Sequence, residues 1–414
     1  MTMKRMIFLA LATALSGTAA WAQRNDIFSN RIASLQVVAG DDWMSMPVAE
    51  LGGTIRIDFD DLTHEYTRYT YKIEHCEADW TVSDELFEAD FVEGFAEGNT
   101  IDDYEPSEGT YQLYTHYTLT LPNEQCRLKM SGNYKLTVMD ENDNNRPVLL
   151  ACFMIVEPLM GVSLSCTDNT DADIRGRHQQ IEMALSYGSV NVTRPEEQIK
   201  TVLMQNKRWD TARHNARAQY VMSDGLRWQH CRDFIFDGGN EYHKFEMLDL
   251  THPTLGIDRM WWDGQRYHAY LFPNEPRKNY VYDEDADGAF CIRNSDNVYV
   301  ETTCDYARVH FRMLSPERLK GDVYVHGDWT YNRFLPEYKL EYNEETHAYE
   351  GATWLKQGYY NYEYLMMDAQ GALVPVPSEG NFYQTENSYQ ALVYYRGTGE
   401  RADRLVAYAV TESR

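Results

Sequence analysis

Residues 134–156 read YKLTVMDENDNNRPVLLACFMIV, and this stretch decides the fold. Apolar and polar side chains alternate over residues 134–138, which predicts a β-strand with one buried face. Residues 140–145 are turn formers and reverse the chain. The apolar run Val148–Val156 then predicts a buried strand, which ends at Glu157-Pro158. The stretch is therefore a hairpin that closes a β-sandwich at about residue 157.

Alternation with a period of two recurs along the chain, whereas long helical periodicity does not. The other predicted strands cover residues 55–59, 69–73, 117–121, 181–185, 199–204, 234–236, 267–272, 307–313, 323–326 and 358–364, and a hairpin joins 280–282 to 290–292. Short strands separated by frequent turns favour an all-β fold of about three tandem immunoglobulin-like β-sandwiches. We expect an N-terminal sandwich at 23–157, a middle one at 158–298, and an early-set immunoglobulin-like sandwich at 299–414.

The N-terminus predicts export. Lys4 and Arg5 precede a short apolar run, and the small-residue pattern Ala20-Trp21-Ala22 follows it. This arrangement is typical of a secretory signal peptide over residues 1–22. The apolar run is well short of the roughly 18 to 20 residues that a membrane-spanning helix needs. A transmembrane barrel is the alternative for an exported β-protein, but residues 84–109 and 194–210 break the even strand spacing that a barrel requires.

Composition excludes some function classes. The 414 residues include 64 acids and 38 bases, for a formal net charge of −26. Nucleic acid is therefore not an expected partner, because its phosphates must be neutralised by Lys and Arg. The seven cysteines form no Cys-x-x-Cys pair and no Cys/His ladder with zinc spacing. We therefore expect no metal site and no cofactor, and we expect the cysteines to be buried thiols.

Two short motifs could carry chemistry, and both are better explained as turns. Asp283-x-Asp285-x-Asp287-Gly288 matches the opening of a calcium loop, but the twelfth position is Asn294 instead of a bidentate Glu, and the flanks read as strands. The segment 283–288 is therefore interpreted as an acidic turn. His326-Gly327-Asp328 lacks a nearby nucleophile. No catalytic residue is assigned.

Charge is distributed unevenly. Residues 73–126 contain fourteen acids and no Lys or Arg, whereas residues 194–232 hold eight bases and four acids. The two segments either are solvated faces or pair with each other between domains. Alternatively, the acidic segment, which carries aromatic side chains, is a long loop that docks on a partner with charge steering the encounter. The candidate partner-binding residues are Asp84, Glu85, Glu88, Asp90, Glu93, Phe95, Asp102, Asp103 and Tyr104.

Several distinctive motifs occur in one order along the chain. In the first domain they are His75-Cys76-Glu77-Ala78-Asp79-Trp80, Phe91-Val92-Glu93-Gly94-Phe95, Ile101-Asp102-Asp103-Tyr104, Tyr114-Thr115-His116-Tyr117 and residues 128–134. Later motifs are Gln205-Asn206-Lys207-Arg208-Trp209-Asp210, Gly238-Gly239-Asn240-Glu241 and residues 385–389, 393–396 and 403–405. Together these motifs resemble a known family, the type IX secretion system plug proteins of Bacteroidota, and the resemblance covers essentially the whole mature chain.

The resemblance implies a periplasmic protein without enzymatic activity. Plug proteins are understood to close the outer-membrane translocon barrel of the type IX secretion system from its periplasmic side when no cargo passes. We assign structural roles to the motif residues, with Trp80 as a core anchor and Asp79 as a turn residue. This structural set is His75, Asp79, Trp80, Asn206, Trp209, Asp210, Gly238, Gly239 and Asn240.

A glycan-binding surface protein is the second hypothesis. The last region resembles immunoglobulin-like modules of glycan-active proteins, in which exposed aromatic rings stack on sugars. An exposed coplanar row of Trp261, Trp262, Trp329 and Trp354 would favour this hypothesis, and buried rings would remove its support. A hydrolase is third, because no constellation of residues supports it.

Overall fold

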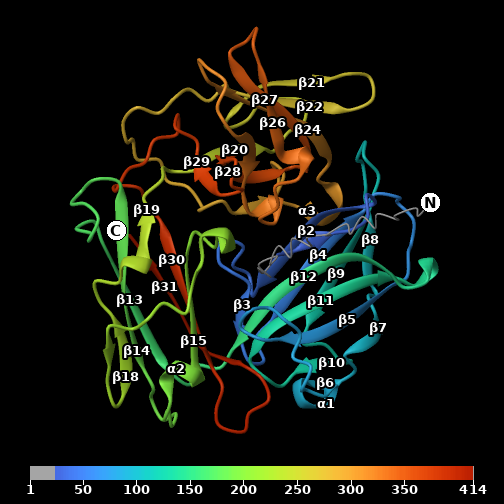
Figure 1. Cartoon of the computed structure of the whole chain (residues 1–414). Helices are drawn as coiled ribbons and strands as arrows, with labels where there is room; N and C mark the ends of the chain where they lie inside the picture. The colour runs from blue at the N-terminus through green and yellow to red at the C-terminus, as the bar shows by residue number, and fades with distance from the viewer. Residues whose placement is uncertain (1–23, 414) are drawn as a thin grey trace, which may run out of the picture.

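The computed structural model describes residues 24–413, which form three groups of β-sheets (Figure 1). The prediction of an all-β fold is confirmed. The predicted signal peptide at 1–22 lies outside the described residues. We call the three groups the first, second and third units, and define them by their strand pairing. Within residues 24–413, no helix combines the length and apolar character needed to cross a membrane.

The first unit contains two sheets and a small two-stranded one. One sheet has the order β1-β12-β11-β5-β7, with β3 beside β12; another has the order β2-β4-β9-β8; and β10 pairs with β6. The strands are β1 (Asp26–Ile27), β2 (Ile32–Ala39), β3 (Val48–Glu50), β4 (Ile55–Asp61), β5 (Tyr69–Cys76), β6 (Val92–Gly94), β7 (Glu97–Thr100), β8 (Asp103–Pro106), β9 (Thr115–Leu121), β10 (Cys126–Leu128), β11 (Gly132–Asp140) and β12 (Arg146–Val156). The short helix α1 (Glu88–Phe91) precedes β6.

The second unit also consists of two sheets, of order β13-β14-β18-β17, with β19 beside β14, and β16-β15-β30-β31. Its elements are β13 (Gly161–Thr167), β14 (His178–Ser186), α2 (Pro195–Gln198), β15 (Ile199–Gln205), β16 (Arg213–His214), β17 (Tyr220–Val221), β18 (Gly225–Trp228), β19 (Ile235–Asp237), β30 (Ser388–Tyr395) and β31 (Arg404–Glu412). β30 therefore pairs with β15, which starts at residue 199, and β31 pairs with β30.

The third unit is a single sheet of ten strands, of order β20-β28-β25-β26-β27-β24-β22-β21, with β23 and β29 beside β28. Its elements are β20 (His243–Met247), β21 (Ile257–Trp262), β22 (Tyr267–Leu271), β23 (Phe290–Ile292), α3 (Val300–Thr303), β24 (Tyr306–Leu314), β25 (Asp322–His326), β26 (Lys339–Asn343), β27 (Ala348–Lys356), β28 (Gly358–Met367) and β29 (Leu373–Pro375). Strands from both ends of the sheet bury side chains in one cluster, so the sheet curls around its own core.

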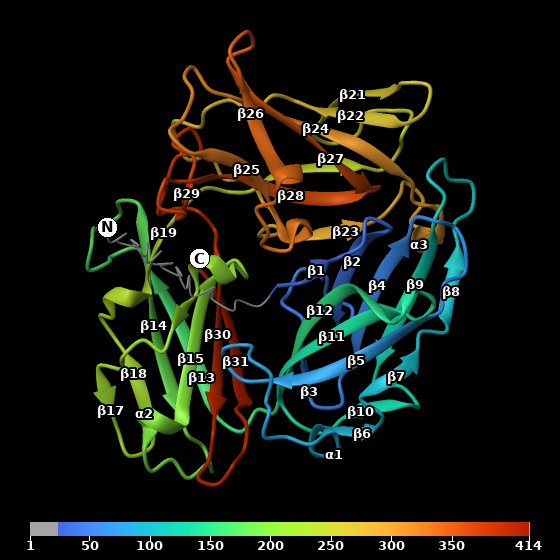
Figure 2. The same ribbon diagram turned by 45° about the vertical axis from the view of Figure 1, so that its right-hand side comes forward.

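Strand pairing divides the chain differently from the predicted domain boundaries at residues 157 and 298. β20 and β23 precede residue 298 and pair with β28. β30 and β31 follow the third unit in sequence, and β30 pairs with β15 on one side and with β31 on the other (Figures 1 and 2). We propose that the third unit, about residues 241–384, is an insertion in the second. The number of immunoglobulin-like domains stays a prediction.

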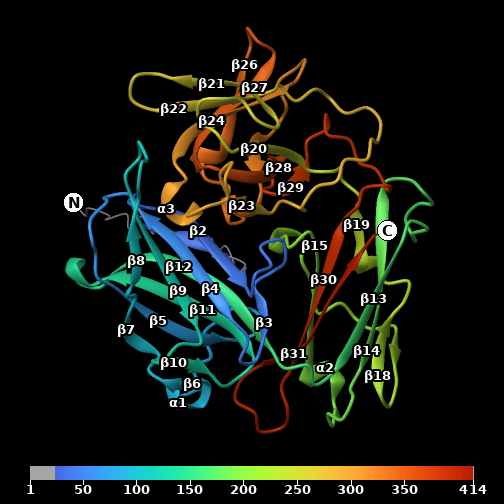
Figure 3. The ribbon, with the colours of Figure 1, turned by 180° about the vertical axis from the view of Figure 1, so that it is seen from behind.

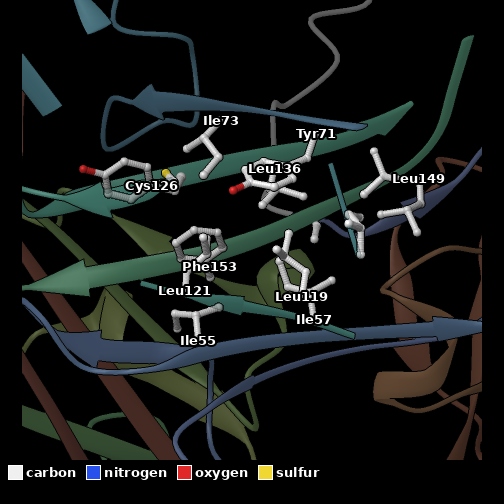
Figure 4. Packing of buried hydrophobic residues seen from close by; sticks show 14 of the residues in the cluster. Ile55, Ile57, Tyr71, Ile73, Leu119, Leu121, Cys126, Leu136, Leu149 and Phe153 are labelled. Atoms are coloured by element: carbon white, nitrogen blue, oxygen red, sulfur yellow. The ribbon is translucent and has the colours of Figure 1, made fainter. Parts of the chain in front are cut away.

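Strand β12 of the hairpin formed by β11 and β12 contributes to two hydrophobic cores. In the first unit, side chains of β4, β5, β9, β11 and β12 point toward one another between the sheets (Figure 4). Leu149, Phe153 and Ile155 belong to this core. The alternate residues Cys152 and Met154 lie in a different cluster, which includes residues of β15, β30 and β31 in the second unit. The apolar run is unbroken because both faces of β12 are buried.

Two expectations about local structure have different outcomes. The predicted hairpin between 280–282 and 290–292 is wrong, because only β23 forms and it pairs with β28. Residues 280–285 have no strand partner, and the Asp285 carboxylate instead accepts hydrogen bonds from the backbone N–H of Tyr242 and Asp287. The seven cysteines are free thiols, five of them buried.

Candidate partner-binding surface

The acidic segment predicted as a long loop contains α1, β6, β7 and β8. β8 is the outer strand of its sheet, and all four of its residues are exposed. β7 and β8 lie on the side of the first unit that faces away from the second unit (Figures 1 and 3), whereas α1 and β6 form one end of the first unit. The predicted residues are therefore divided between two places.

The acidic side chains are mostly free of ion pairs. In the part of the chain that the structure describes, the exposed acids of this segment that have no ion pair are Asp84, Glu85, Glu88, Glu93, Glu97, Asp102, Asp103, Glu105 and Glu108. A surface with this many unpaired carboxylates attracts cations and cationic partners over a distance set by the salt concentration.

Asp90 differs from the other predicted residues because it stabilises the fold. Its carboxylate accepts from the backbone N–H of Phe87 at 2.8 Å, at the start of α1. It also lies 2.7 Å from the Arg401 guanidinium of the second unit. The backbone N–H of Phe87 and the side chain of Arg401 lower its pKa. Asp90 is therefore held by contacts within the chain.

Aromatic side chains accompany the acids at both places. Phe87 and Phe95 are 75% and 67% exposed at the α1 end. Tyr104 of β8 is 41% exposed, and its ring contacts that of Tyr66 with centroids 4.7 Å apart. Phe91, by contrast, belongs to the core. Exposed rings beside carboxylates are the chemistry expected of a docking surface with an apolar centre and a charged rim.

The first motif fixes a buried turn. His75 is 1% exposed, with Nδ1 2.8 Å from Ser83 Oγ and Nε2 3.1 Å from the carbonyl oxygen of Ser131. Burial lowers the pKa of His75 to about 4. Gly132 has φ +147°, and a Cβ there would lie 2.2 Å from His75 Nε2. The Gly132 backbone can approach the imidazole this closely only because glycine has no side chain.

Two tryptophans from distant motifs meet where the first and second units join. Trp80 is 1% exposed and contacts Trp209 edge to face, with centroids 5.7 Å apart. Asp79 is exposed, and its carboxylate accepts from the backbone N–H of Thr81 at 3.0 Å, within a turn. Nearby, the Asp403 carboxylate accepts from the backbone N–H of Ala78 at 3.0 Å.

Residues 206–210 lie where the second unit meets the third. Lys207 Nζ lies 2.8 Å from an Asp328 carboxylate oxygen, and the Arg208 guanidinium lies 3.0 Å from Glu363 and 2.7 Å from Asp210. Both bases are at most 10% exposed. Burial raises the pKa of Glu363 and of Asp210, but the attraction of Arg208 together with hydrogen bonds and the nearby His326 outweighs it, so that both pKa values are lowered. The charge-rich motif therefore joins units instead of presenting a free surface.

Asn206 and the motif 238–240 hold the crossings between the second and third units. Asn206 Nδ2 donates to Asn387 Oδ1 at 2.8 Å, just before β30 begins. Asn240 Nδ2 donates to the Glu379 carbonyl at 2.7 Å. A Cβ on Gly238 would lie 2.1 Å from the Phe382 carbonyl oxygen, whereas Gly239 has φ +65°. These residues fix the strands that enter and leave the third unit.

Sequence reasoning missed a buried charge cluster between the first and third units. The Asp60 carboxylate of β4 accepts from Lys356 Nζ at 2.6 Å and from Tyr306 Oη at 2.6 Å. His116 Nδ1 lies 2.7 Å from Asp60. Asp305 accepts from the backbone N–H of Gln112 at 2.9 Å. Asp60 continues the polar positions of the alternating strand predicted at residues 55–59, and such positions are expected to face solvent. Its burial results from the contact with the third unit, which the sequence pattern does not show.

The calcium and His-Asp patterns do not assemble sites. Asp283 pairs with Lys244 Nζ at 2.6 Å, while Asp285 caps backbone N–H groups. Burial, with the nearby Asp287 carboxylate, raises the pKa of Asp285 to about 8. Among residues 24–413, no three His, Cys, Asp or Glu side chains are grouped so that they could hold a metal. His326 contacts Glu363 at 3.1 Å instead of Asp328.

Comparison with known proteins agrees with this architecture. The family model described as "Type 9 secretion system plug protein 1st domain" matches residues 32–157. The chain is also similar to a hypothetical protein from Parabacteroides merdae ATCC 43184, whose crystal structure was determined at 2.30 Å resolution. Sequence identity is 36% and the TM-score is 0.90, and the match covers 94% of this chain and 99% of that one.

No curated protein matches the chain. The matched family belongs to a secretion system and is not a family of enzymes. The matched residues span the first unit from β2 to the end of β12, which includes the predicted partner-binding residues and the first set of motifs. Residues 32–157 therefore match the first domain of the type IX secretion system plug protein family, and this match supports an involvement of the protein in type IX secretion.

Proposed function

We propose that this protein docks on the periplasmic side of the type IX outer-membrane translocon barrel and seals its pore when no cargo passes. The protein is exported by its signal peptide and has no enzymatic role. The observation that carries the proposal is the match of the plug family's first domain to residues 32–157.

A rigid shape supports the proposal, because a seal must not deform under a solute gradient. Buried contacts join all three units. The cluster containing Trp80 and Trp209 connects the first and second units, Asp60 and Lys356 connect the first and third, and Arg208 with Glu363 connects the second and third. Breaking a buried ion pair by losing one partner costs about 3–5 kcal/mol. The protein therefore arrives at its partner as a single body.

The exposed acids of the first unit supply the proposed docking contacts. A plug must bind tightly enough to seal and must still leave when transport begins. Charged contacts at the rim of an interface set orientation and the rate of association more than they set tightness. Asp84, Glu85, Asp102 and Asp103 meet this requirement because they are exposed and, within residues 24–413, free of ion pairs. We propose that they face a basic rim on the barrel.

The experiment is an affinity pull-down of the tagged mature protein from detergent-solubilised outer membranes, with mass spectrometry of the eluate. We expect one very large outer-membrane barrel in near-equal amount. In planar bilayers, adding the protein to the periplasmic side of that barrel should abolish its conductance. Recovery of no barrel, or an unchanged conductance, would exclude the plug function.

A charge-reversal variant tests the docking surface. Glu85→Lys, Asp102→Lys and Asp103→Lys together should reduce barrel recovery at unchanged thermal stability, since all three side chains are exposed. The matched control reverses Glu196, Glu344 and Glu345, which are exposed on the second and third units. Equal loss in both variants would mean that net charge, and not this surface, matters. Raising salt from about 0.01 M to 0.15 M shortens the Debye length from roughly 30 to 8 Å and should slow association.

A further inference from the structure

A cleft between the first and third units has no part in the proposed docking. Its volume is about 630 Å³, within the range of small-molecule sites. The floor is formed by three strands of the third unit, because β20 and β23 both pair with β28, and register places Glu246, Tyr359 and Cys291 side by side. β23 lies on the side of the third unit next to the first unit (Figures 2 and 3). Trp43 and Met44, from the loop between β2 and β3, form one wall. We call this the three-strand cleft.

Two aromatic rings form a fixed corner of the cleft. The rings of Trp43 and Tyr359 meet edge to face, with centroids 6.0 Å apart and planes at 73°. Such a contact covers one face of one ring only. The loop is held by the Asp42 carboxylate, which accepts from the backbone N–H of Met44 at 3.0 Å, and by Lys207 Nζ, which donates to the Met44 carbonyl at 2.8 Å. Rings that are already in place attract a cation without a further ordering cost.

The bases that line the cleft already have acidic partners. Lys244 Nζ lies 2.6 Å from an Asp283 carboxylate oxygen. The Arg293 guanidinium lies 3.4 Å from Glu246. An anion that entered the cleft would have to compete with these carboxylates for both bases. The charges on the cleft therefore do not favour an anion.

Two acids that line the cleft have no cationic partner. Within residues 24–413, neither Glu284 nor Asp285 forms an ion pair. The Asp285 carboxylate accepts from the backbone N–H groups of Tyr242 and Asp287, and an ionised carboxylate has room for about four hydrogen bonds. Burial, followed by repulsion from the Asp287 carboxylate, raises the pKa of Asp285 to about 8. A cation bound beside Asp285 would offset both effects.

We propose that the three-strand cleft binds a small aliphatic amine through its ammonium group. The ammonium group donates to the carboxylates of Glu284 and Asp285 and lies over the ring of Trp43, which is the aromatic side chain that binds cations best. The alkyl chain contacts apolar side chains that also line the cleft, which are Leu255, Ile292 and Val300. A free amine and the side chain of a lysine share this chemistry.

Other classes of ligand fit the cleft less well. The net charge of −26 attracts cations to the protein and repels anions. Within the described range 24–413, no three His, Cys, Asp or Glu side chains are grouped to hold a metal ion. A neutral alcohol would leave both acids without a cation. The exposed row of four tryptophans that would favour a glycan does not form, because Trp329 is 4% exposed.

The test is calorimetric titration of the mature protein, in about 0.15 M salt to screen unspecific attraction, with cadaverine, pentanol and glutarate. The three probes share their chain length and differ in their end groups. We expect cadaverine to bind at one site, and pentanol and glutarate not to bind. A tripeptide with a central lysine and blocked ends distinguishes a free amine from a lysine side chain as the source of the ammonium group. Equal binding of pentanol or glutarate, or no binding of either amine, would overturn the proposal.

Variants locate the binding site. Glu284→Gln should weaken cadaverine binding about tenfold or more, since an ionised hydrogen-bond partner is lost. Trp43→Leu should weaken it about fivefold through the lost contact between the cation and the ring. Glu344→Gln and Trp261→Leu, at exposed sites that do not line the cleft, are the matched controls and should leave affinity unchanged. Equal losses in the controls would contradict this location, and thermal melting of all four variants establishes that they are folded.

The pH dependence of binding tests Asp285 separately. The charged groups that face Asp285 are Asp287, Glu241 and Lys244, and the hydroxyl of Tyr359 is also near. An alkyl ammonium stays charged up to about pH 10, whereas Asp285 must lose its proton to pair with it. Cadaverine affinity should therefore increase about tenfold from about pH 6.5 to about pH 9, and Asp285→Asn should abolish the increase. A constant affinity in the unmodified protein would exclude Asp285 as a ligand.

Discussion

Replacing Lys356 with Met tests how strongly the third unit is attached to the first. Lys356 and Asp60 are both 1% exposed at the side chain, and Nζ lies 2.6 Å from Oδ2. Lys356 Nζ also donates to the Glu301 carbonyl at 2.9 Å. The substitution keeps the length of the apolar stem, so the loss is mainly electrostatic.

The magnitude depends on which charges remain. Removing one partner of a buried pair costs about 3–5 kcal/mol. In Lys356→Met, His116 still lies 2.7 Å from Asp60 and compensates its charge, which favours the lower end, about 3 kcal/mol. Asp60→Asn leaves Lys356 without its carboxylate and leaves His116 with only Asp58, at 3.7 Å, which favours about 5 kcal/mol. The double variant Asp60→Asn, Lys356→Met should be more stable than the sum of the two single losses predicts, by about 1–3 kcal/mol.

Urea unfolding at pH 7, followed by tryptophan fluorescence and circular dichroism, measures these free energies. Lys339→Met is the matched control, because Lys339 pairs with Asp322 and Glu341 at the surface, and exposed pairs contribute at most about 1 kcal/mol. A loss in Lys356→Met as small as that of the control would refute the reasoning. Strict additivity of the Asp60 and Lys356 effects would refute it equally.

Three further predictions concern stability. Burial lowers the pKa of His116, but hydrogen bonds to two carboxylates outweigh burial and raise the pKa to about 9. The resulting stabilisation of the folded state, about 3 kcal/mol, is complete below pH 6.5 and is lost as the pH rises through 9. Urea unfolding at pH 6 and at pH 9.5 will measure this loss. Trp209→Ala should cost about 3–5 kcal/mol in the same assay because it leaves a cavity beside Trp80. Gly132→Ala should lower the melting temperature, with a loss of about 1–3 kcal/mol, because its Cβ would overlap His75.

Controls accompany these three variants. His116→Gln removes the titrating group and should abolish the pH dependence of stability, so a slope that persists would assign it elsewhere. Trp261→Ala, at an exposed site, should cost much less than Trp209→Ala. At Gly98, φ is +86° but a Cβ would meet nothing within 4 Å. Gly98→Ala therefore measures backbone strain alone, and an equal effect of Gly132→Ala would exclude the clash.

The sequence was sufficient to predict most strands, and insufficient to predict how they are ordered in space. Period-two alternation reports a local property, the burial of one face, and located β4, β5, β9 and β11. The pairing of Ile199 with Tyr395 joins residues far apart in the chain, and no local pattern encodes such a pairing. The hairpin expected at 280–292 failed because hydrogen bonds to side chains, including Asp285, replaced strand pairing.

The candidate surface was predictable in composition but not in shape. A base-free acidic segment is visible in the sequence, and most of its acids are indeed exposed. The sequence could not show that Asp90, unlike the neighbouring acids, forms an ion pair, because its partner Arg401 is more than three hundred residues away. Asp60 was concealed for a similar reason: the polar face of β4 contacts the third unit, which the alternation of Ile57 and Phe59 does not indicate.

The double burial of β12 limits how this protein can move. Its alternate side chains belong to two cores, so any hinge that opened between the first and second units would bring Cys152 and Met154 into water together with their partners Leu392 and Tyr394. Such an opening resembles partial unfolding in its cost. Under the proposed function, the protein must then leave the translocon by a translation or rotation of its whole body. Distances between spectroscopic labels in these two units should stay constant while labels across the proposed contact with the barrel separate.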